Sequence, residues 1–135
     1  MNSVFESEVE IRPDDIDMNN HVHSSKYIDY VLAARYIQMR ENYKMPMEEF
    51  HSLGYNWVIS VSHIEFKRAL KLGDKILVKT QIKEIDGPHA KVGFWILKKQ
   101  SAKVAAEGYF IYTMVSLSTG KPVRISEELI KRYSV

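Results

Sequence analysis

The sequence predicts an α+β fold in which a curved antiparallel sheet of about five strands wraps around one long helix. Residues 24–44 place apolar side chains at helical spacing, whereas the chain after Gly54 changes to the period of two that is typical of β-strands. These later strands are expected at 57–67, 75–85, 90–99 and 103–117. A chain of 135 residues suits one folding unit, so we assign residues 1–135 to a single domain.

The N-terminal part of the chain predicts a first strand followed by a polar loop. Residues 3–12 alternate polar and apolar side chains, and Pro13 ends this strand or confines it to a sheet edge. Residues 14–23 are mostly polar and directly precede the long helix. We expect Asp14 and Asp15 to serve the turn and its solvation, because aspartate is common in turns.

The helix over 24–44 is predicted to be buried on most of its circumference. Its apolar residues at helical spacing are Tyr27, Tyr30, Val31, Ala34 and Ile37, and those on the other side are Ile28, Leu32 and Ala33. Ser24 or Ser25 is the expected N-cap, since a serine hydroxyl can accept a hydrogen bond from an otherwise unpaired N–H. Shorter helices are expected at 46–53 and 126–133.

The later strands are predicted to form a sheet with one wet face. Ile76, Val78 and Ile82 point to one side, and Lys79 points to the other. Short connections, such as the turn at 86–89, imply an antiparallel meander. Only a strongly curved sheet can surround a helix, and a chain of this size leaves parts of the helix and the sheet edges uncovered. We therefore expect a homodimer or homotetramer.

Composition and charge exclude several classes of function. The formal net charge of +2 is too small for a nucleic-acid partner, which usually requires a concentrated basic face. The chain has no cysteine, so disulfides, thiolate catalysis and zinc–thiolate sites are excluded. No apolar run approaches the ~20 residues of a membrane helix, and the chain begins with no visible signal peptide. We expect a cytoplasmic protein without a membrane partner.

Three segments resemble one known family, in the same order along the chain. Residues 15–22 read Asp-Ile-Asp-Met-Asn-Asn-His-Val and precede Tyr27. They resemble the D-x-D-x-x-G-H/V-V loop and helix tyrosine of hotdog-fold acyl-CoA thioesterases of the 4-hydroxybenzoyl-CoA thioesterase family, which is related to the acyl-ACP thioesterases. Residues 63–76 and 120–129 resemble later segments of that family. Asn20 stands where the family usually has glycine, and asparagine tolerates the left-handed backbone that such a turn needs.

The resemblance implies a hotdog fold and the hydrolysis of an acyl thioester, most simply an acyl-CoA. It implies that Asp17 attacks the thioester carbonyl or activates a water that does so. It also implies that a backbone N–H at the start of the helix, at Ser24 or its neighbour Ser25, polarises the carbonyl oxygen. Coenzyme A is then part of the substrate, and no separate cofactor is expected. An acyl-carrier-protein thioester is the alternative substrate, and a non-catalytic acyl-binding hotdog protein is the alternative function.

The residue types agree with this chemistry. A carboxylate can act as a nucleophile or as a general base, and an ordinary aspartate is ionised at neutral pH. Free N–H groups at a helix start provide an oxyanion site without any side chain. A hotdog hydratase or dehydratase would instead need a catalytic histidine in a different motif, typically with Pro-Gly nearby, and no such stretch occurs.

Further residues are candidates for contacts with the substrate: His21, Val22, His23, Ser25, Tyr27, Lys67 and Arg68. The basic residues, with Lys71, Lys121 and Arg124, are able to hold the phosphates of coenzyme A or to steer an acidic carrier protein. A solvated basic face is the alternative interpretation. His21 and His23 alternate as two metal ligands beside a carboxylate would, but we assign His21 to the pocket and expect no metal ion.

Overall fold

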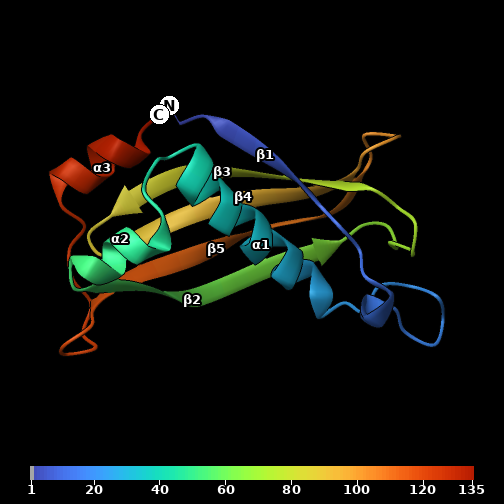
Figure 1. Cartoon of the computed structure of the whole chain (residues 1–135), viewed down its shortest axis with the longest axis horizontal. Helices are drawn as coiled ribbons and strands as arrows, with labels where there is room; N and C mark the ends of the chain where they lie inside the picture. Colours follow the sequence, from blue (N-terminus) through green and yellow to red (C-terminus); the bar gives the residue numbers. More distant parts are fainter. Residues whose placement is uncertain (1) are drawn as a thin grey trace.

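The structure, a computed structural model, describes residues 2–135 and confirms the predicted order of helices and strands (Figure 1). The elements are β1 (Val4–Val9), a 3-10 turn η1 (Pro13–Asp15), α1 (Lys26–Glu41), α2 (Met47–Ser52), β2 (Tyr55–Phe66), β3 (Ile76–Asp86), β4 (His89–Lys98), β5 (Val104–Ser116) and α3 (Glu127–Tyr133). The predicted ranges located the strands and α-helices well, since their ends differ by at most three residues, whereas η1 was not predicted. None of the helices in the described residues is both long and apolar enough to cross a lipid bilayer.

The five strands form one antiparallel sheet in the order β1-β3-β4-β5-β2. The predicted meander is therefore correct for β3, β4 and β5 but wrong for β2, which lies at the far edge beside β5. The connection over 67–75 carries the chain across the end of the sheet. Its first two N–H groups donate to the Ala105 carbonyl beside the start of β5, and the Lys75 carbonyl accepts from Lys99 after β4. A crossing of three interstrand distances is about 14 Å, well within the reach of this connection.

Helix α1 lies across one face of the sheet (Figure 1). Its buried face presents Tyr30, Val31 and Ala34 to a core that includes Phe94 and Phe110 of the sheet. The sheet supplies its half of this core by alternation. In β3, Ile76, Val78, Thr80 and Ile82 are all buried, whereas the side chains between them are partly exposed, so the predicted wet face is confirmed.

The predicted burial of α1 on most sides is wrong within one chain. Leu32, Ala33 and Tyr36 are exposed on the side of the helix that faces away from the sheet. A single sheet covers only one face of a helix, and the short helices α2 and α3 pack at the far end of the sheet rather than over α1 (Figure 1). The uncovered side of α1 thus remains an apolar surface of the isolated chain.

One feature brings β2 close to β5, and another sets the position of α1 on the sheet. Gly108 in β5 lets β2 approach closely, because an added Cβ would lie 1.9 Å from the His63 carbonyl oxygen. The fully buried Gln38 then ties the helix to two strands. Its amide nitrogen donates to the Ser7 hydroxyl at 3.1 Å, and its amide oxygen accepts from the Thr80 hydroxyl. These directional bonds fix the helix along its own axis, which apolar packing alone does not do.

Candidate active site

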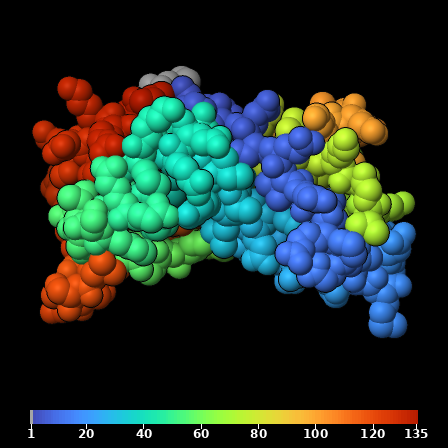
Figure 2. Space-filling view, in the orientation of Figure 1, coloured from blue at the N-terminus to red at the C-terminus, as the bar shows by residue number. Residues whose placement is uncertain are grey.

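The polar loop before α1 folds back on itself as a tight turn and projects at the end of the molecule opposite α2 and α3 (Figure 2). The Asp17 N–H donates to the His21 carbonyl at 2.7 Å, and Ile16 pairs with Val22 in an antiparallel bridge. Asn20 has a φ of 61°, so the predicted left-handed asparagine at the glycine position of the loop is confirmed. The turn thereby keeps its shape without glycine.

The Asp17 carboxylate is held by the backbone of its own turn. Oδ1 accepts hydrogen bonds from the N–H groups of His21, at 3.1 Å, and Asn19, at 2.8 Å. The bond from His21, aided by that from Asn19, holds the pKa of Asp17 below its usual value. Oδ2 accepts no hydrogen bond from the described residues. Asp17 is thus an ionised carboxylate with one oxygen fixed and the other available for chemistry.

The start of α1 leaves backbone N–H groups unpaired, although not in the way the sequence predicted. Ser25 occupies the cap position with a helical backbone, and its hydroxyl makes no capping hydrogen bond. The predicted cap position at Ser25 is therefore confirmed, but the predicted capping bond of its hydroxyl is wrong, because the preceding turn replaces it: Lys26 N–H donates to the His23 carbonyl, and Tyr27 N–H to the Ser24 carbonyl. Within residues 2–135, the N–H groups of Ser24 and Ser25 donate to no acceptor. They are available as oxyanion donors.

Leu70 anchors the loop and the helix start to the core. Its carbonyl accepts from Val22 N–H at 2.8 Å, and its own N–H donates to the Tyr27 hydroxyl at 3.1 Å. Both Val22 and Tyr27 are buried in the core, where the Tyr27 ring packs edge-on against Phe66. These two side chains hold the loop in place, and their contact with the substrate stays a prediction.

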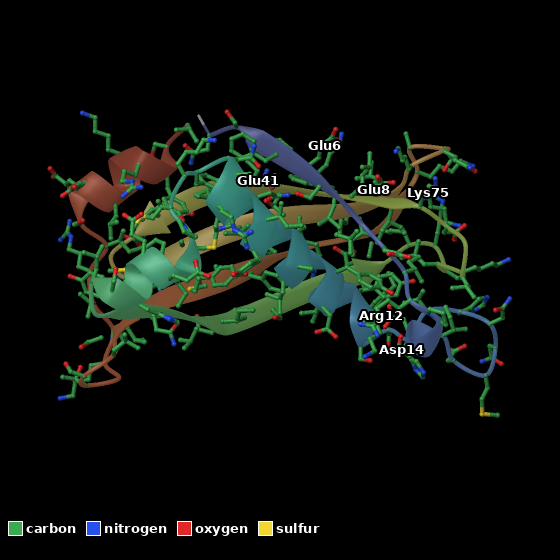
Figure 3. All side chains as sticks on the ribbon, viewed as in Figure 1. Glu6, Glu8, Arg12, Asp14, Glu41 and Lys75 are labelled. Carbon is green, nitrogen blue, oxygen red and sulfur yellow. The ribbon has the colours of Figure 1, made fainter. Side chains whose placement is uncertain are left out.

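The expectation that Asp15 is a solvated turn residue is wrong, because Asp15 is buried and serves the structure. Its Oδ2 accepts from the Tyr30 hydroxyl at 2.7 Å and from Arg12 N–H at 3.0 Å. Burial raises the pKa of Asp15, but these two hydrogen bonds outweigh burial and hold the pKa below its usual value. Asp14 is exposed beside Arg12, as expected for a turn residue (Figure 3). The sequence indicated this role only weakly. Tyr30 lies on the buried face of the helix, so its hydroxyl needs a hydrogen-bond partner, but the sequence does not show that Asp15 is that partner.

The two histidines of the loop lie beside Asp17 in the chain. His21 is partly buried and His23 is exposed. Through their backbones they close the turn: His21 N–H binds Asp17, and His23 N–H donates to the Asp15 carbonyl at 2.9 Å. No group of three histidine or carboxylate side chains in residues 2–135 is arranged to hold a metal ion.

The structure divides the basic candidates between the two ends of β5. Lys67 and Arg68 lie beside its first residues, whereas Lys121 and Arg124 follow its last. A strand of 13 residues is about 40 Å long, so these two pairs form no common phosphate site within one chain. Lys67 lies near two glutamates, and an Arg68 nitrogen donates to the Val104 carbonyl at 2.6 Å. Lys67 and Arg68 are the pair on the same side as Leu70 and the polar loop.

The fold and this loop define a hotdog protein with a carboxylate turn at the start of its central helix. The chain belongs to the thioesterase-like superfamily, whose sequence profile matches residues 11–133. The long-chain acyl-CoA thioesterase FadM of Escherichia coli (strain K12) is 18% identical over 125 residues, which cover 93% of each protein. The predicted family resemblance and the thioester-hydrolase class are thus confirmed.

Solved structures support the same fold. The DHNA-CoA thioesterase of Staphylococcus aureus superposes with a TM-score of 0.88 at 16% identity, covering 97% of this chain and 89% of that one. The 1,4-dihydroxy-2-naphthoyl-CoA thioesterase Slr0204 of Synechocystis superposes with a TM-score of 0.85 at 17% identity, covering 97% of this chain and 96% of that one. SAV2348 of Staphylococcus aureus, solved in complex with CoA, superposes with a TM-score of 0.86 at 17% identity, covering 98% of this chain and 82% of that one. These likenesses confirm the predicted hotdog fold.

Replacing Tyr30 by phenylalanine should destabilise the loop anchor. The buried Asp15 carboxylate would lose a hydrogen bond, which lowers the free energy of unfolding by about 1–3 kcal/mol at neutral pH. Because the folded pKa of Asp15 is depressed, this contribution is present above the unfolded pKa near 3.8 and is lost as the pH falls through the folded value. Urea unfolding of the wild-type protein and Tyr30→Phe, at neutral pH and at a pH below the folded pKa of Asp15, measures the difference in free energy of unfolding.

Tyr36→Phe is the matched control for this measurement. The Tyr36 hydroxyl also donates to a carboxylate, that of Glu48, but this pair is exposed. Its loss should change the free energy of unfolding by less than about 1 kcal/mol. Equal effects of the two substitutions would contradict a special role for the buried pair.

Proposed function

We propose that this protein hydrolyses acyl-CoA thioesters, with the Asp17 carboxylate acting at the thioester carbonyl carbon. The backbone N–H of Ser24 or Ser25 binds the carbonyl oxygen. One observation supports this most strongly: a single hydrogen-bonded loop carries both a fixed, ionised carboxylate and unpaired N–H groups at a helix start. A nucleophile or base together with an oxyanion site is the minimum that thioester hydrolysis needs.

The reaction has two balanced routes. As a nucleophile, Asp17 Oδ2 bonds to the carbonyl carbon, the C–S bond breaks, and the thiolate takes a proton. Water then cleaves the acyl-aspartate anhydride to give the free acid and the original carboxylate. As a general base, Oδ2 accepts a proton from water while that water adds to the carbon, and the proton passes to the leaving thiolate. Both routes place negative charge on the carbonyl oxygen, where the helix N–H groups stabilise it.

Coenzyme A is the proposed thiol because the relatives share it. FadM is a long-chain acyl-CoA thioesterase, and two structural neighbours act on an aromatic acyl-CoA, so among these three the acyl group differs while the carrier does not. Lys67 and Arg68, near the anchor at Leu70, are the proposed phosphate contacts, and His21 and His23 are proposed to line the thioester site. An acyl-carrier-protein thioester remains the alternative substrate.

A homodimer or homotetramer is the proposed form in solution. β2 is a 12-residue edge strand that carries the exposed apolar residues Val58, Ile59 and Val61, and α1 exposes Leu32 and Tyr36. Long open edges with apolar side chains favour pairing with another chain. Sedimentation at micromolar concentration should give a mass of at least two chains, and a stable monomer would contradict the proposal.

The catalytic role of Asp17 predicts a large loss of turnover in Asp17→Asn. The substitution is nearly isosteric but removes the anion, so kcat should fall by at least ~100-fold, the range for loss of a general base. Thiol release from a panel of short, long and aromatic acyl-CoA thioesters measures it and identifies the preferred acyl group.

Asp14→Asn is the matched control, because Asp14 is an exposed aspartate of the same segment and should leave kcat within about twofold. Turnover that survives in Asp17→Asn would contradict the assignment of Asp17. If the wild-type protein hydrolyses neither acyl-CoA nor acyl-carrier-protein thioesters, the hydrolase proposal fails and a non-catalytic acyl-binding protein remains.

A further inference from the structure

An apolar cavity of about 260 Å³ lies at the end of the molecule opposite the polar loop. The second half of α1, together with α2, α3 and the sheet, encloses it, and its walls include Met39, Phe50, Trp57, Val92 and Leu129. None of the candidate catalytic residues lines it. An apolar cavity of about 150 Å³ is already large enough to bind benzene, so this one accepts a larger hydrocarbon group.

One charged side chain, Arg35 of α1, forms part of this apolar wall. Arg35 is only 7% exposed, and its Nε and Nη1 have no hydrogen-bond partner in residues 2–135. No carboxylate in the described part of the chain forms an ion pair with it. The guanidinium carbon lies 5.4 Å from the centroid of the Tyr43 ring. The position of Arg35 among aromatic rings supplies some attraction but no counter-charge.

The neighbouring phenols do not neutralise Arg35. Burial raises the pKa of both Tyr43 and Tyr112, and the nearby Arg35 charge offsets this only in part. Burial likewise raises the pKa of Tyr133, whose hydroxyl donates to the Met45 carbonyl at 2.7 Å. All three are therefore uncharged at neutral pH. A buried cation without an anion or a full set of acceptors is strongly unfavourable, so an anionic partner would stabilise Arg35.

We propose that the cavity binds an amphiphilic carboxylic acid, with the carboxylate paired to Arg35 and the hydrocarbon part against the apolar walls. A guanidinium is the preferred protein partner for a carboxylate, because its N–H groups make charge-assisted hydrogen bonds. The exposed Leu32, Tyr36 and Ile59 also line the cavity, so it opens between α1 and β2, at the surface proposed to pair with another chain.

The acid has two possible sources. It is a free fatty or aromatic acid, or it is the far end of an acyl thioester that carries a second carboxylate. The second source rests on the proposed hydrolysis. The lengths match, because Arg35 lies about 13 Å along the helix axis from Lys26 at the helix start, a distance that a medium-length acyl chain spans.

Calorimetric titration with decanoate and with decanol tests the carboxylate site directly. The wild-type protein should bind decanoate at least ~10-fold more tightly than decanol, which corresponds to about 1.4 kcal/mol. Arg35→Met should lose this preference. Arg40→Met is the matched control: Arg40 lies on the same helix but is exposed and outside the cavity, so its substitution should keep the preference. The same titrations in Asp17→Asn should match the wild type, so a failure of the proposed hydrolysis leaves this test intact.

Equal affinity of the wild-type protein for decanoate and decanol would overturn the proposal, as would a preference that survives in Arg35→Met. The variant should fold at least as well as the wild type without ligand, because replacing an unpaired buried charge by an apolar side chain is often neutral or stabilising. If it does not fold, the wild-type comparison of acid and alcohol decides.

Kinetics distinguish the two sources. If the acid belongs to the substrate, the wild-type kcat/KM should be at least ~10-fold higher for the ω-carboxy derivative of decanoyl-CoA than for decanoyl-CoA, and Arg35→Met should abolish the difference. If decanoate binds at Arg35 but the two thioesters react equally well, the cavity is a site for a free acid. Both results support a carboxylate site, and both require the binding preference above.

Discussion

The backbone of Leu70 makes the pair of hydrogen bonds on which the candidate site depends. Its carbonyl binds Val22 at the end of the polar loop, and its N–H binds the Tyr27 hydroxyl in the first turn of α1. Leu70 is itself fully buried, in the connection that crosses the end of the sheet. One residue therefore fixes the loop, the helix start and the β2–β3 connection to the same core. Catalytic groups must be held to within a fraction of an ångström, and this anchor provides that rigidity.

Within the loop, two aspartates two positions apart have opposite roles because their surroundings differ. Asp15 points inward and stabilises the fold through Tyr30 and the backbone of Arg12. Asp17 remains at the surface, bound through one oxygen to its own turn. Both have a lowered pKa, since each accepts hydrogen bonds that favour the charged form. Each keeps one carboxylate oxygen without a hydrogen bond from the described residues, but Asp15 is buried, whereas Asp17 lies where a substrate can reach it.

The sequence predicted what is local in this molecule. The sequence pattern located every strand and α-helix, though not η1, and the loop motif identified the left-handed Asn20. The order of the strands in the sheet could not be predicted from local periodicity, because β2 pairs with β5 through contacts that are distant in sequence. The cap position at Ser25 was predicted correctly, but the capping bond of its hydroxyl was not, because backbone carbonyls of the preceding turn already bind the first helix N–H groups. Capping propensity describes single residues, whereas the replacement of a side-chain cap by backbone carbonyls depends on the path of the chain.

Buried charge was the other feature that the sequence did not reveal. Arg35 lies four residues after Val31 on the buried face of α1, but a long cationic side chain usually reaches the solvent from such a position. Arg35 is buried because its side chain lies in the cavity wall, beside the Tyr43 ring and together with residues of α2, α3 and the sheet. The two halves of α1 thus lie in different surroundings: the first carries the candidate reaction site, and the second lines the apolar cavity.

The most direct test of the central claim is a crystal structure of Asp17→Asn with a bound, unhydrolysed acyl-CoA. The account predicts that the thioester carbonyl oxygen lies about 3 Å from the backbone nitrogen of Ser24 or Ser25. It also predicts that the side chain at position 17 faces the carbonyl carbon. A thioester bound away from the start of α1, or turned away from position 17, would contradict the account.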